Sequence, residues 1–270
     1  MTERINNKAD DFDKLYSLMD ILRSECPWDR EQTLLSLRQH TLEEVHEVIE
    51  AVDLAAHKRD WLPLKAELGD LLFQIAFYAH IAEEANAFNF TDVIQTLVAK
   101  MIYRHPHLFK DAKPRDVEQQ WEQLKEAEHP DRHSLMDGIP PLPALKYAQK
   151  QQQRATRVGF DWQQTADVMV KMREEMDELE HEIDTQADMS RIEDEFGDVL
   201  FTLANLARKL NLDAELCLMS TNRKFAKRFR GMEQAAAASS MTLDQMDLDE
   251  QEVLYQKVKS AQAMKNQGDQ

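Results

Sequence analysis

The sequence predicts an all-α protein made of two similar halves. Gly and Pro are scarce, at 6 and 8 of 270 residues, and apolar residues recur three and four positions apart along most of the chain. No segment shows the alternation of apolar and polar residues that is typical of a half-buried β-strand. One acidic pattern occurs in both halves, which indicates an internal duplication.

In the first half, Thr41 and Glu44 have the spacing of a capping box, so we expect a helix to begin at Thr41. Val45, Val48 and Val52 then form an apolar stripe at helical spacing. The helices expected in this half cover residues 8–24, 41–58, 63–85, 91–103 and 114–128.

The halves are separated by residues 136–143, which contain three Pro and one Gly. Because this segment interrupts the helical pattern, we expect one domain over residues 1–135 and another over residues 136–270. Residues 235–240 are expected to form a loop of the second half alone. The helices expected in the second half cover residues 142–156, 164–186, 189–210, 213–232 and 249–264.

The composition limits the classes of protein to consider. A formal net charge of −17 disfavours nucleic-acid binding, which relies on Lys and Arg to neutralise phosphates. Mean hydropathy is −0.61, and no apolar run approaches the ~20 residues of a spanning helix. The N-terminal residues contain no apolar targeting segment, and Cys26 and Cys217 are too few for a disulfide framework. We therefore expect a cytoplasmic protein with no membrane association.

The duplicated pattern is an E-E-x-x-E unit followed by E-x-G-D. Residues three apart lie on one face of a helix, so each unit points two carboxylates the same way. Two such helices packed together would bring four acids to one place. The candidate metal ligands are therefore Glu44, Glu47, Glu67 and Asp70 in the first half and Glu175, Glu178, Glu195 and Asp198 in the second.

Four carboxylates in one place need a counter-charge. Two like charges ~4 Å apart repel by roughly 4 kcal/mol at an effective dielectric of ~20, so the group would protonate, separate or bind a cation. Oxygen ligands without Cys or His suit Mg²⁺ or Mn²⁺ better than Zn²⁺ or Cu²⁺. The alternative is a solvated helix face, which is usual for Glu-rich helices but is disfavoured by the duplication.

Basic and aromatic residues follow the acids in both halves. A Lys and an Arg lie four positions apart, and an aromatic residue with a Lys four positions later comes after them. Such cations suit polyphosphate oxygens, and the ring is either a surface for a nucleobase or an ordinary core residue. These residues are Lys100, Arg104, Trp121 and Lys125 in the first half and Lys224, Arg228, Tyr255 and Lys259 in the second.

Two Glu-x-x-His units compete with this interpretation, because di-iron helical bundles use the same unit. They begin at Glu43 and at Glu178 and end at His46 and His181. Neither His recurs at the aligned position of the other half, whereas all four acids do. The duplication therefore favours the carboxylate site over a di-iron site.

Several motifs together make the chain resemble the MazG family of nucleoside triphosphate pyrophosphohydrolases. They are C-P-W-D at residues 26–29, E-L-G-D-L-L-F-Q at 67–74, R-H-P-H-L-F at 104–109, V-G-F-D-W at 158–162 and the paired acidic units. The resemblance covers nearly the whole chain in the tandem form of the family. It implies two helical MazG-type domains whose bundles are completed by homodimerisation.

The resemblance also implies an activity. It is the Mg²⁺-dependent hydrolysis of NTPs or dNTPs to nucleoside monophosphate and pyrophosphate, with Mn²⁺ as a substitute ion and with nucleotide-pool control as the role. A link to a toxin–antitoxin system or to a stress regulator follows from the same likeness. The alternative is a helical scaffold that binds a metal, a nucleotide or a partner without turnover.

Residue roles carried over from the family fall in the second half. Glu175, Glu178, Glu195 and Asp198 would hold the metal, and Glu174 is the candidate for orienting or deprotonating the water. The second domain is favoured as the catalytic one, because Lys171 and Arg191 add cations near its acids, where the first half has Arg38 and Lys65. The first domain is then a second enzyme, a regulatory site or a dimerisation scaffold. The residues implied to contact the substrate are Lys171, Arg191, Lys224, Arg228 and Lys259 at the phosphates and Tyr255, often Trp in the family, at the nucleotide.

Overall fold

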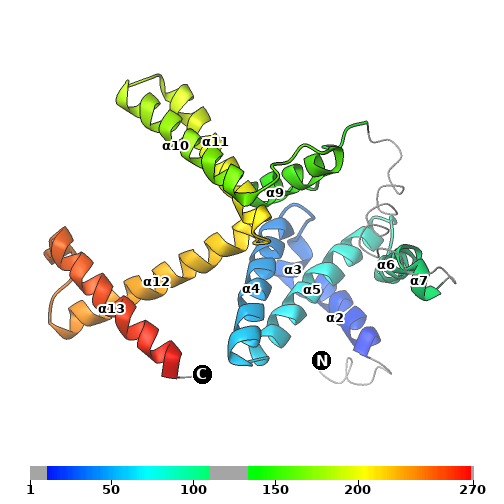
Figure 1. Ribbon diagram of the computed structural model, residues 1–270. Coiled ribbons are helices and arrows are strands. Elements are labelled where there is room, and N and C mark those ends of the chain that lie inside the picture. The colour runs from blue at the N-terminus through cyan, green and yellow to red at the C-terminus, as the bar shows by residue number, and fades with distance from the viewer. Residues whose placement is uncertain (1–10, 110–132, 269–270) are drawn as a thin grey trace. The chain divides into compact units, whose positions relative to one another are not determined.

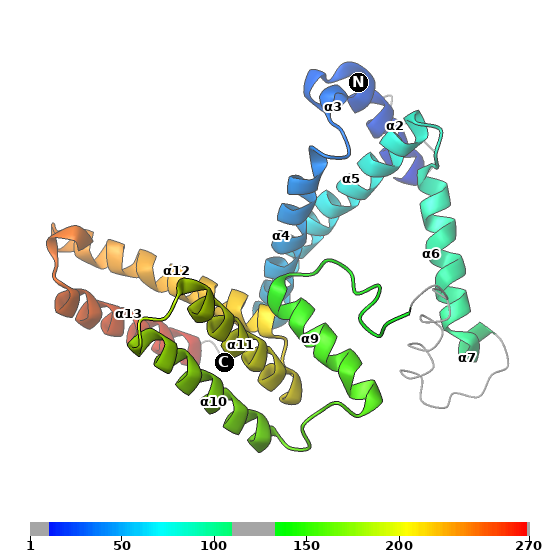
Figure 2. The same cartoon turned by 90° about the horizontal axis from the view of Figure 1, so that it is seen from above.

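The computed structural model describes residues 11–109 and 133–268, with side chains in the last helix described as far as residue 262. Within these residues the chain forms helices, turns and loops and contains no β-strand, which confirms the all-α prediction. The contacts divide the chain into two compact units, Met1–Pro130 and Asp131–Gln270. Figures 1 and 2 show the helices of each unit.

The first unit is built around a pair of long helices, α4 and α5, that pack side by side (Figure 1). Helix α2 packs on α5 and carries Met19, which is buried with Leu37, Ala76 and Phe77 in the core of this unit. The helices are α2 (Asp11–Glu25), α3 (Pro27–Glu31), α4 (Leu37–Lys58), α5 (Leu62–Glu84), α6 (Phe90–Arg104) and α7 (Pro106–Phe109).

The second unit repeats this plan with a pair formed by α10 and α11, and α9 packs on α11 as α2 packs on α5. Helix α12 then packs against α13 (Figure 2). The elements are α9 (Ala144–Ala155), the 3₁₀ turn η1 (Thr156–Val158), α10 (Thr165–Asp184), α11 (Met189–Lys209), α12 (Ala214–Ala238), the 3₁₀ turn η2 (Leu243–Gln245) and α13 (Leu248–Gly268).

The predicted start of the second helix was wrong. Helix α4 begins at Leu37, four residues before Thr41. The hydroxyl of Thr41 donates to the carbonyl of Leu37 and bonds to the Tyr78 hydroxyl. The preceding turn is closed instead by Thr33 and Ser36, each of which donates its backbone N–H to the other's hydroxyl. Burial of Leu37, 1% exposed, explains the additional turn.

The loop expected at residues 235–240 was also wrong over most of its length. Helix α12 continues to Ala238, because four consecutive Ala residues are strong helix formers and Ala236 is buried. Ser239 caps the helix, and the next residue, Ser240, has a left-handed φ of 56°. Two short helices, α3 and α7, were not expected, and the helix expected at 114–128 lies outside the described residues.

Among the described residues, no helix is long and apolar enough to cross a membrane.

Candidate active site

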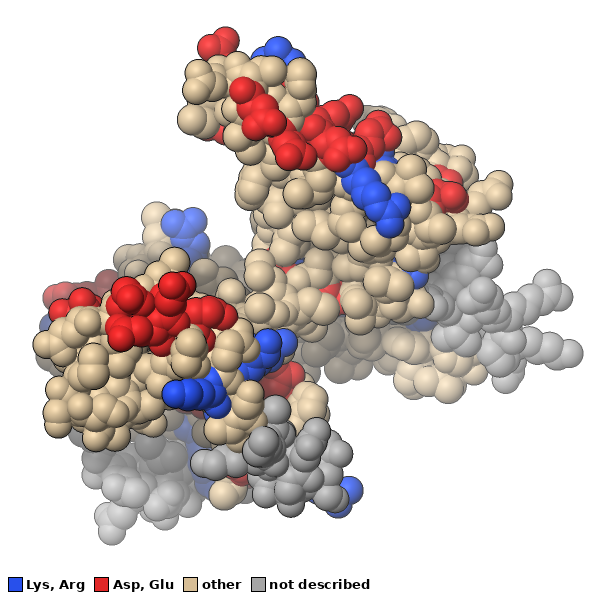
Figure 3. Space-filling view, turned by 60° about the vertical axis from the view of Figure 1, so that its left-hand side comes forward, with Lys and Arg blue, Asp and Glu red and all other residues tan. Residues whose placement is uncertain are grey.

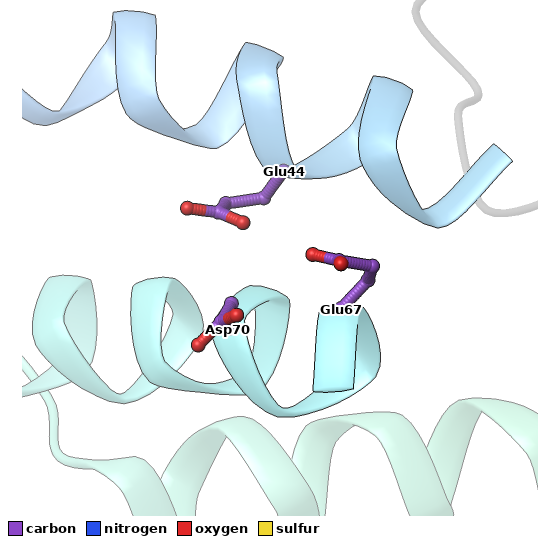
Figure 4. A group of neighbouring side chains, drawn as sticks. All are labelled: Glu44, Glu67 and Asp70. Atoms are coloured by element: carbon purple, nitrogen blue, oxygen red, sulfur yellow. The ribbon is translucent and has the colours of Figure 1, made fainter. Parts of the chain in front are cut away.

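In the first unit, three of the four predicted acids converge between α4 and α5. Carboxylate oxygens of Glu44, Glu67 and Asp70 all lie within 4.8 Å of one another. Figure 4 shows Glu44 extending from α4 toward the two acids of α5. The hairpin explains the meeting, since the three-residue spacing of Glu67 and Asp70 places both on the face of α5 that looks at α4.

The second unit forms the same group from the aligned residues. Carboxylate oxygens of Glu175, Glu195 and Asp198 lie within 4.8 Å of one another. Glu175, on α10, is only 5% exposed, whereas Asp198 on α11 is exposed. A buried carboxylate facing two others is costly unless a positive charge is near, and Lys171 Nζ lies 2.8 Å from Glu175 Oε1. A buried, paired carboxylate does not fit a merely solvated helix face.

The electrostatics of the first group show such a cost. Burial raises the pKa of Glu44, and the charges of Asp70, Glu47 and Glu67 raise it further. Burial likewise raises the pKa of Glu67, with Glu47 and Asp70 adding to it. Glu44 and Glu67 therefore resist ionisation because of burial and of their acidic neighbours, and a bound cation would offset that resistance.

The fourth acid of each predicted set stands at the edge of its group. Glu47 and Glu178 are not among the oxygens that converge within 4.8 Å, but both are close enough to interact electrostatically. Burial raises the pKa of Glu178, Lys171 lowers it, and Glu175 and Glu195 raise it. The candidate ligand groups in the described residues contain only carboxylates, which disfavours the di-iron alternative.

Lys171 is in direct contact with the acids of the second unit. Its Nζ lies 2.7 Å from Glu174 Oε1 and 2.8 Å from Glu175 Oε1. Hydrogen bonds to Glu174 and Glu175 raise the pKa of Lys171 well above its usual range. In the first unit the aligned contact is made by His40, whose Nδ1 is 3.2 Å from Glu43. The second unit therefore has a permanent cation where the first has a His.

Arg191, at the start of α11, forms an ion pair with Glu182 near the end of α10. Glu182 is 5% exposed, and its second oxygen, Oε2, has no hydrogen-bond partner among the described residues. The Arg191 side chain itself is 66% exposed. Arg191 therefore ties the two helices of the hairpin together while it still reaches solvent.

The remaining predicted substrate contacts lie on α12 and α13. Arg228 donates to the Tyr255 hydroxyl at 3.1 Å, and its guanidinium carbon lies 5.7 Å from the centre of the Tyr255 ring. Lys224 and Lys259 are exposed, as is Lys100 of the first unit. Trp121 and Lys125 lie outside the described residues. On the face shown in Figure 3, acidic side chains gather in patches with fewer basic side chains beside them.

One partly exposed group of ion pairs was not predicted from the sequence. Asp161, in the loop after η1, lies 2.5 Å from Arg208 Nη2 and 2.7 Å from Lys209 Nζ at the end of α11. The available signal was the V-G-F-D-W motif at residues 158–162, to which we assigned no role. The contact fixes the loop between α9 and α10 against α11.

Comparison with known proteins agrees with this geometry. The sequence model of the family described as "MazG nucleotide pyrophosphohydrolase domain" matches residues 32–109 and 163–231. The nucleoside triphosphate pyrophosphohydrolase of Escherichia coli K12 is 41% identical over 257 residues, which is 92% of this chain and 96% of that protein. A Thermotoga maritima protein named nucleoside triphosphate pyrophosphohydrolase/pyrophosphatase MazG is 42% identical over 252 residues, 92% of this chain and 95% of that protein. The uncharacterised protein YabN of Bacillus subtilis is 38% identical over 242 residues, 88% of this chain and 49% of its own length.

Proposed function

The chain belongs to the MazG family of nucleotide pyrophosphohydrolases, and from this premise we propose that it hydrolyses nucleoside triphosphates to nucleoside monophosphate and pyrophosphate. The observation that carries the proposal is the convergence of three carboxylates in each unit, at aligned positions of two long helices. Full-length relatives at 41% and 42% identity carry the name of this activity.

Enzymes of this family depend on a divalent metal, and the donor sets fit one. Each set offers only carboxylate oxygens, and burial with like-charge repulsion already raises the pKa of Glu44, Glu67 and Glu178. We propose Mg²⁺, with Mn²⁺ as a substitute, because both prefer oxygen ligands. When bound, such an ion supplies positive charge for phosphate oxygens and acidifies water. The residues that would hold it are Glu44, Glu47, Glu67 and Asp70, and Glu175, Glu178, Glu195 and Asp198.

The reaction needs one bond made and one broken. Water adds to the α-phosphorus, the bond from that phosphorus to the oxygen bridging to the β-phosphate breaks, and pyrophosphate leaves. The water gives up a proton, and we propose Glu174 as the group that orients it and accepts the proton. The contact with Lys171 holds Glu174 beside Glu175, which supports this role.

We propose that basic side chains of the second unit bind the triphosphate. Lys171 already contacts the acids and Arg191 reaches solvent from the same hairpin. The hydrogen bond from Arg228 to the Tyr255 hydroxyl would keep both side chains in place to contact a bound nucleotide. Together with the exposed Lys224 and Lys259, these residues supply the positive charge that a protein of net charge −17 otherwise lacks.

We propose further that the second domain, residues 136–270, is the main catalytic one and that residues 1–135 form a second MazG-like domain. The support is Lys171, a permanent cation beside the acids of the second unit. The aligned residue of the first unit is His40, which is not permanently charged. Nucleotide-pool control in the cytoplasm is the proposed role. A link to a stress regulator or to a toxin–antitoxin system is proposed from the family alone. The net charge of −17 argues against nucleic acid as a partner.

A homodimer is proposed because each hairpin leaves an apolar face uncovered in the single chain. A Cβ added at Gly69 or Gly197 would meet no atom within 4 Å, so both helices could be approached closely by another. The exposed apolar residues are Leu42, Val45, Val52, Leu68, Leu72 and Ile75 on α4 and α5, and Val170, Met176, Ile183, Phe196, Leu200 and Leu203 on α10 and α11.

Incubation of the protein with NTPs and Mg²⁺, followed by product analysis, tests the function. We expect pyrophosphate and nucleoside monophosphate, and no orthophosphate from the enzyme itself. Asp198→Ala should remove most of the turnover and Asp70→Ala a smaller part, with helicity unchanged. A protein that binds NTPs but releases no pyrophosphate would instead be the binding scaffold.

A further inference from the structure

The second unit contains a cavity of about 370 Å³ that the proposed metal and phosphate residues do not use. It lies between α9, the loop after η1 and α11. Its walls include the rings of Phe160, Trp162 and Phe201, and its polar groups include Gln152, Asn205 and Arg208. A mostly apolar cavity of this size with a few convergent polar groups is typical of a small-molecule site.

One polar atom in this wall lacks a partner. Gln152 is 8% exposed, and its Nε2 donates to the carbonyl of Phe201 at 2.8 Å. That bond fixes the amide, and the buried Oε1 has no hydrogen-bond partner in the part of the chain that the structure describes. Gln149, one turn earlier and equally buried, uses both of its amide groups, on Leu212 and Ala214. Leaving an amide oxygen buried and unpaired costs free energy, so Oε1 fits an N–H group from a ligand.

The cavity and the acid group of the same unit share one helix, α11. Asp198, Phe201, Asn205 and Arg208 follow one another at i, i+3, i+7 and i+10, which places them along one stripe of α11. At 1.5 Å per residue, Asn205 lies about 10 Å along the axis from Asp198. A ligand with its phosphates at the acids would therefore extend its other end toward this cavity.

We propose that this cavity binds the base of the nucleoside triphosphate, with Gln152 Oε1 accepting an N–H of the base edge and Phe160 and Trp162 offering stacking surfaces. The inference rests on the proposed function and adds its specificity-determining residues. Every common base carries an N–H on its pairing edge and two flat faces, which suits an acceptor between aromatic rings. Phe160 and Trp162 lie on one loop with Asp161, and the ion pairs of Asp161 with Arg208 and Lys209 hold that loop against α11.

The test compares NTPs with ribose 5-triphosphate, which has the same phosphates and sugar but no base. The full chain carries Glu67→Ala and Asp70→Ala, so that only the second unit turns over. In that background we expect Gln152→Leu and Phe160→Ala each to lower kcat/KM for NTPs about tenfold, the worth of one good hydrogen bond or stacking contact. The kcat/KM for ribose 5-triphosphate should not change, and that unchanged value also shows that the variant is folded.

Two matched variants serve as controls. Gln149→Leu removes an equally buried amide that the fold already satisfies, and Val158→Ala shortens a side chain that is 70% exposed in the η1 turn before this loop. Both should keep the NTP preference over ribose 5-triphosphate. If Gln152→Leu and Phe160→Ala also keep the NTP preference over ribose 5-triphosphate, the cavity is not the base site. The same conclusion follows if the unaltered chain turns over NTPs and the background chain does not, because the second unit is then inactive. Absence of pyrophosphate release by the unaltered chain would instead contradict the proposed function itself.

Discussion

At the scale of residues, the acids that define the site are also a source of instability. Burial and four neighbouring carboxylates raise the pKa of Glu44, so its folded-state pKa exceeds the unfolded one. Ionisation of Glu44 therefore weakens the fold as pH rises through the folded-state pKa. A divalent cation reverses this effect, which links metal binding to stability.

This linkage predicts the behaviour of Glu44→Gln. Without metal, the variant should melt about 2 °C or more above the parent protein, because one repelling charge is gone. The upward shift of Tm caused by Mn²⁺ should shrink. Glu50→Gln, an exposed change on the same helix, should alter neither value. A variant that melts below the parent without metal would show that the repulsion is unimportant.

Asp161 gives a pH dependence of the opposite sign. Burial alone would raise its pKa, but hydrogen bonds from Arg208 and Lys209 lower it below the usual value. The contact therefore stabilises the fold above the unfolded-state pKa of ~3.9 and is lost as pH falls through the lower folded-state value.

The corresponding variant is Asp161→Asn. We expect it to lower the free energy of unfolding by about 1 kcal/mol at pH 7, less than the ~1.5–3 kcal/mol of a hydrogen bond to a charged group, because Asp161 is partly exposed to solvent. Urea unfolding at a series of pH values should show this difference shrinking once pH falls below ~3.9. A difference that stays constant down to pH 3 would mean that the Asp161 charge is not what stabilises the loop.

At the scale of elements, the helix pairs could be predicted because their apolar residues repeat at helical spacing and their acids repeat between halves. The start of α4 could not, because it depends on burial of Leu37 in a core formed with Met19 and Phe77. The pairing of Arg191 with Glu182 was equally hidden, since it depends on the geometry of the turn that joins α10 to α11. The cavity beside Gln152 needs three separate segments, so no local pattern indicates it.

The contact between α12 and α13 leads to a prediction at Gly231. A Cβ there would lie 2.7 Å from Cγ1 of Val258, a distance so short that the Val258 side chain or α13 itself must shift. Gly231→Ala should therefore lower the free energy of unfolding by about 1–3 kcal/mol, the usual cost of overpacking. Gly231→Ala with Val258→Ala should recover most of it. Equal stability of Gly231→Ala and the parent protein in urea would contradict this packing.

At the scale of the whole molecule, the uncovered faces of the two hairpins predict self-association. Sedimentation equilibrium should give twice the chain mass of 31.5 kDa. Leu72→Asp and Leu200→Asp, both at exposed positions, should together shift the mass to that of one chain, because charges resist burial in an apolar interface. Leu248→Asp, also exposed but on α13, is the control. A single-chain mass for the parent protein would exclude the dimer.

The central claim is that each group of converging carboxylates holds a divalent cation. Titration of metal-free protein with Mn²⁺, followed by the electron paramagnetic resonance signal of the free ion, tests it most directly. The parent protein should remove Mn²⁺ from solution, Asp198→Ala should lose the part due to the second unit, and Asp198→Ala with Asp70→Ala should lose binding at both groups. Unchanged Mn²⁺ uptake by the folded double variant would contradict the assignment of these acids as the metal ligands.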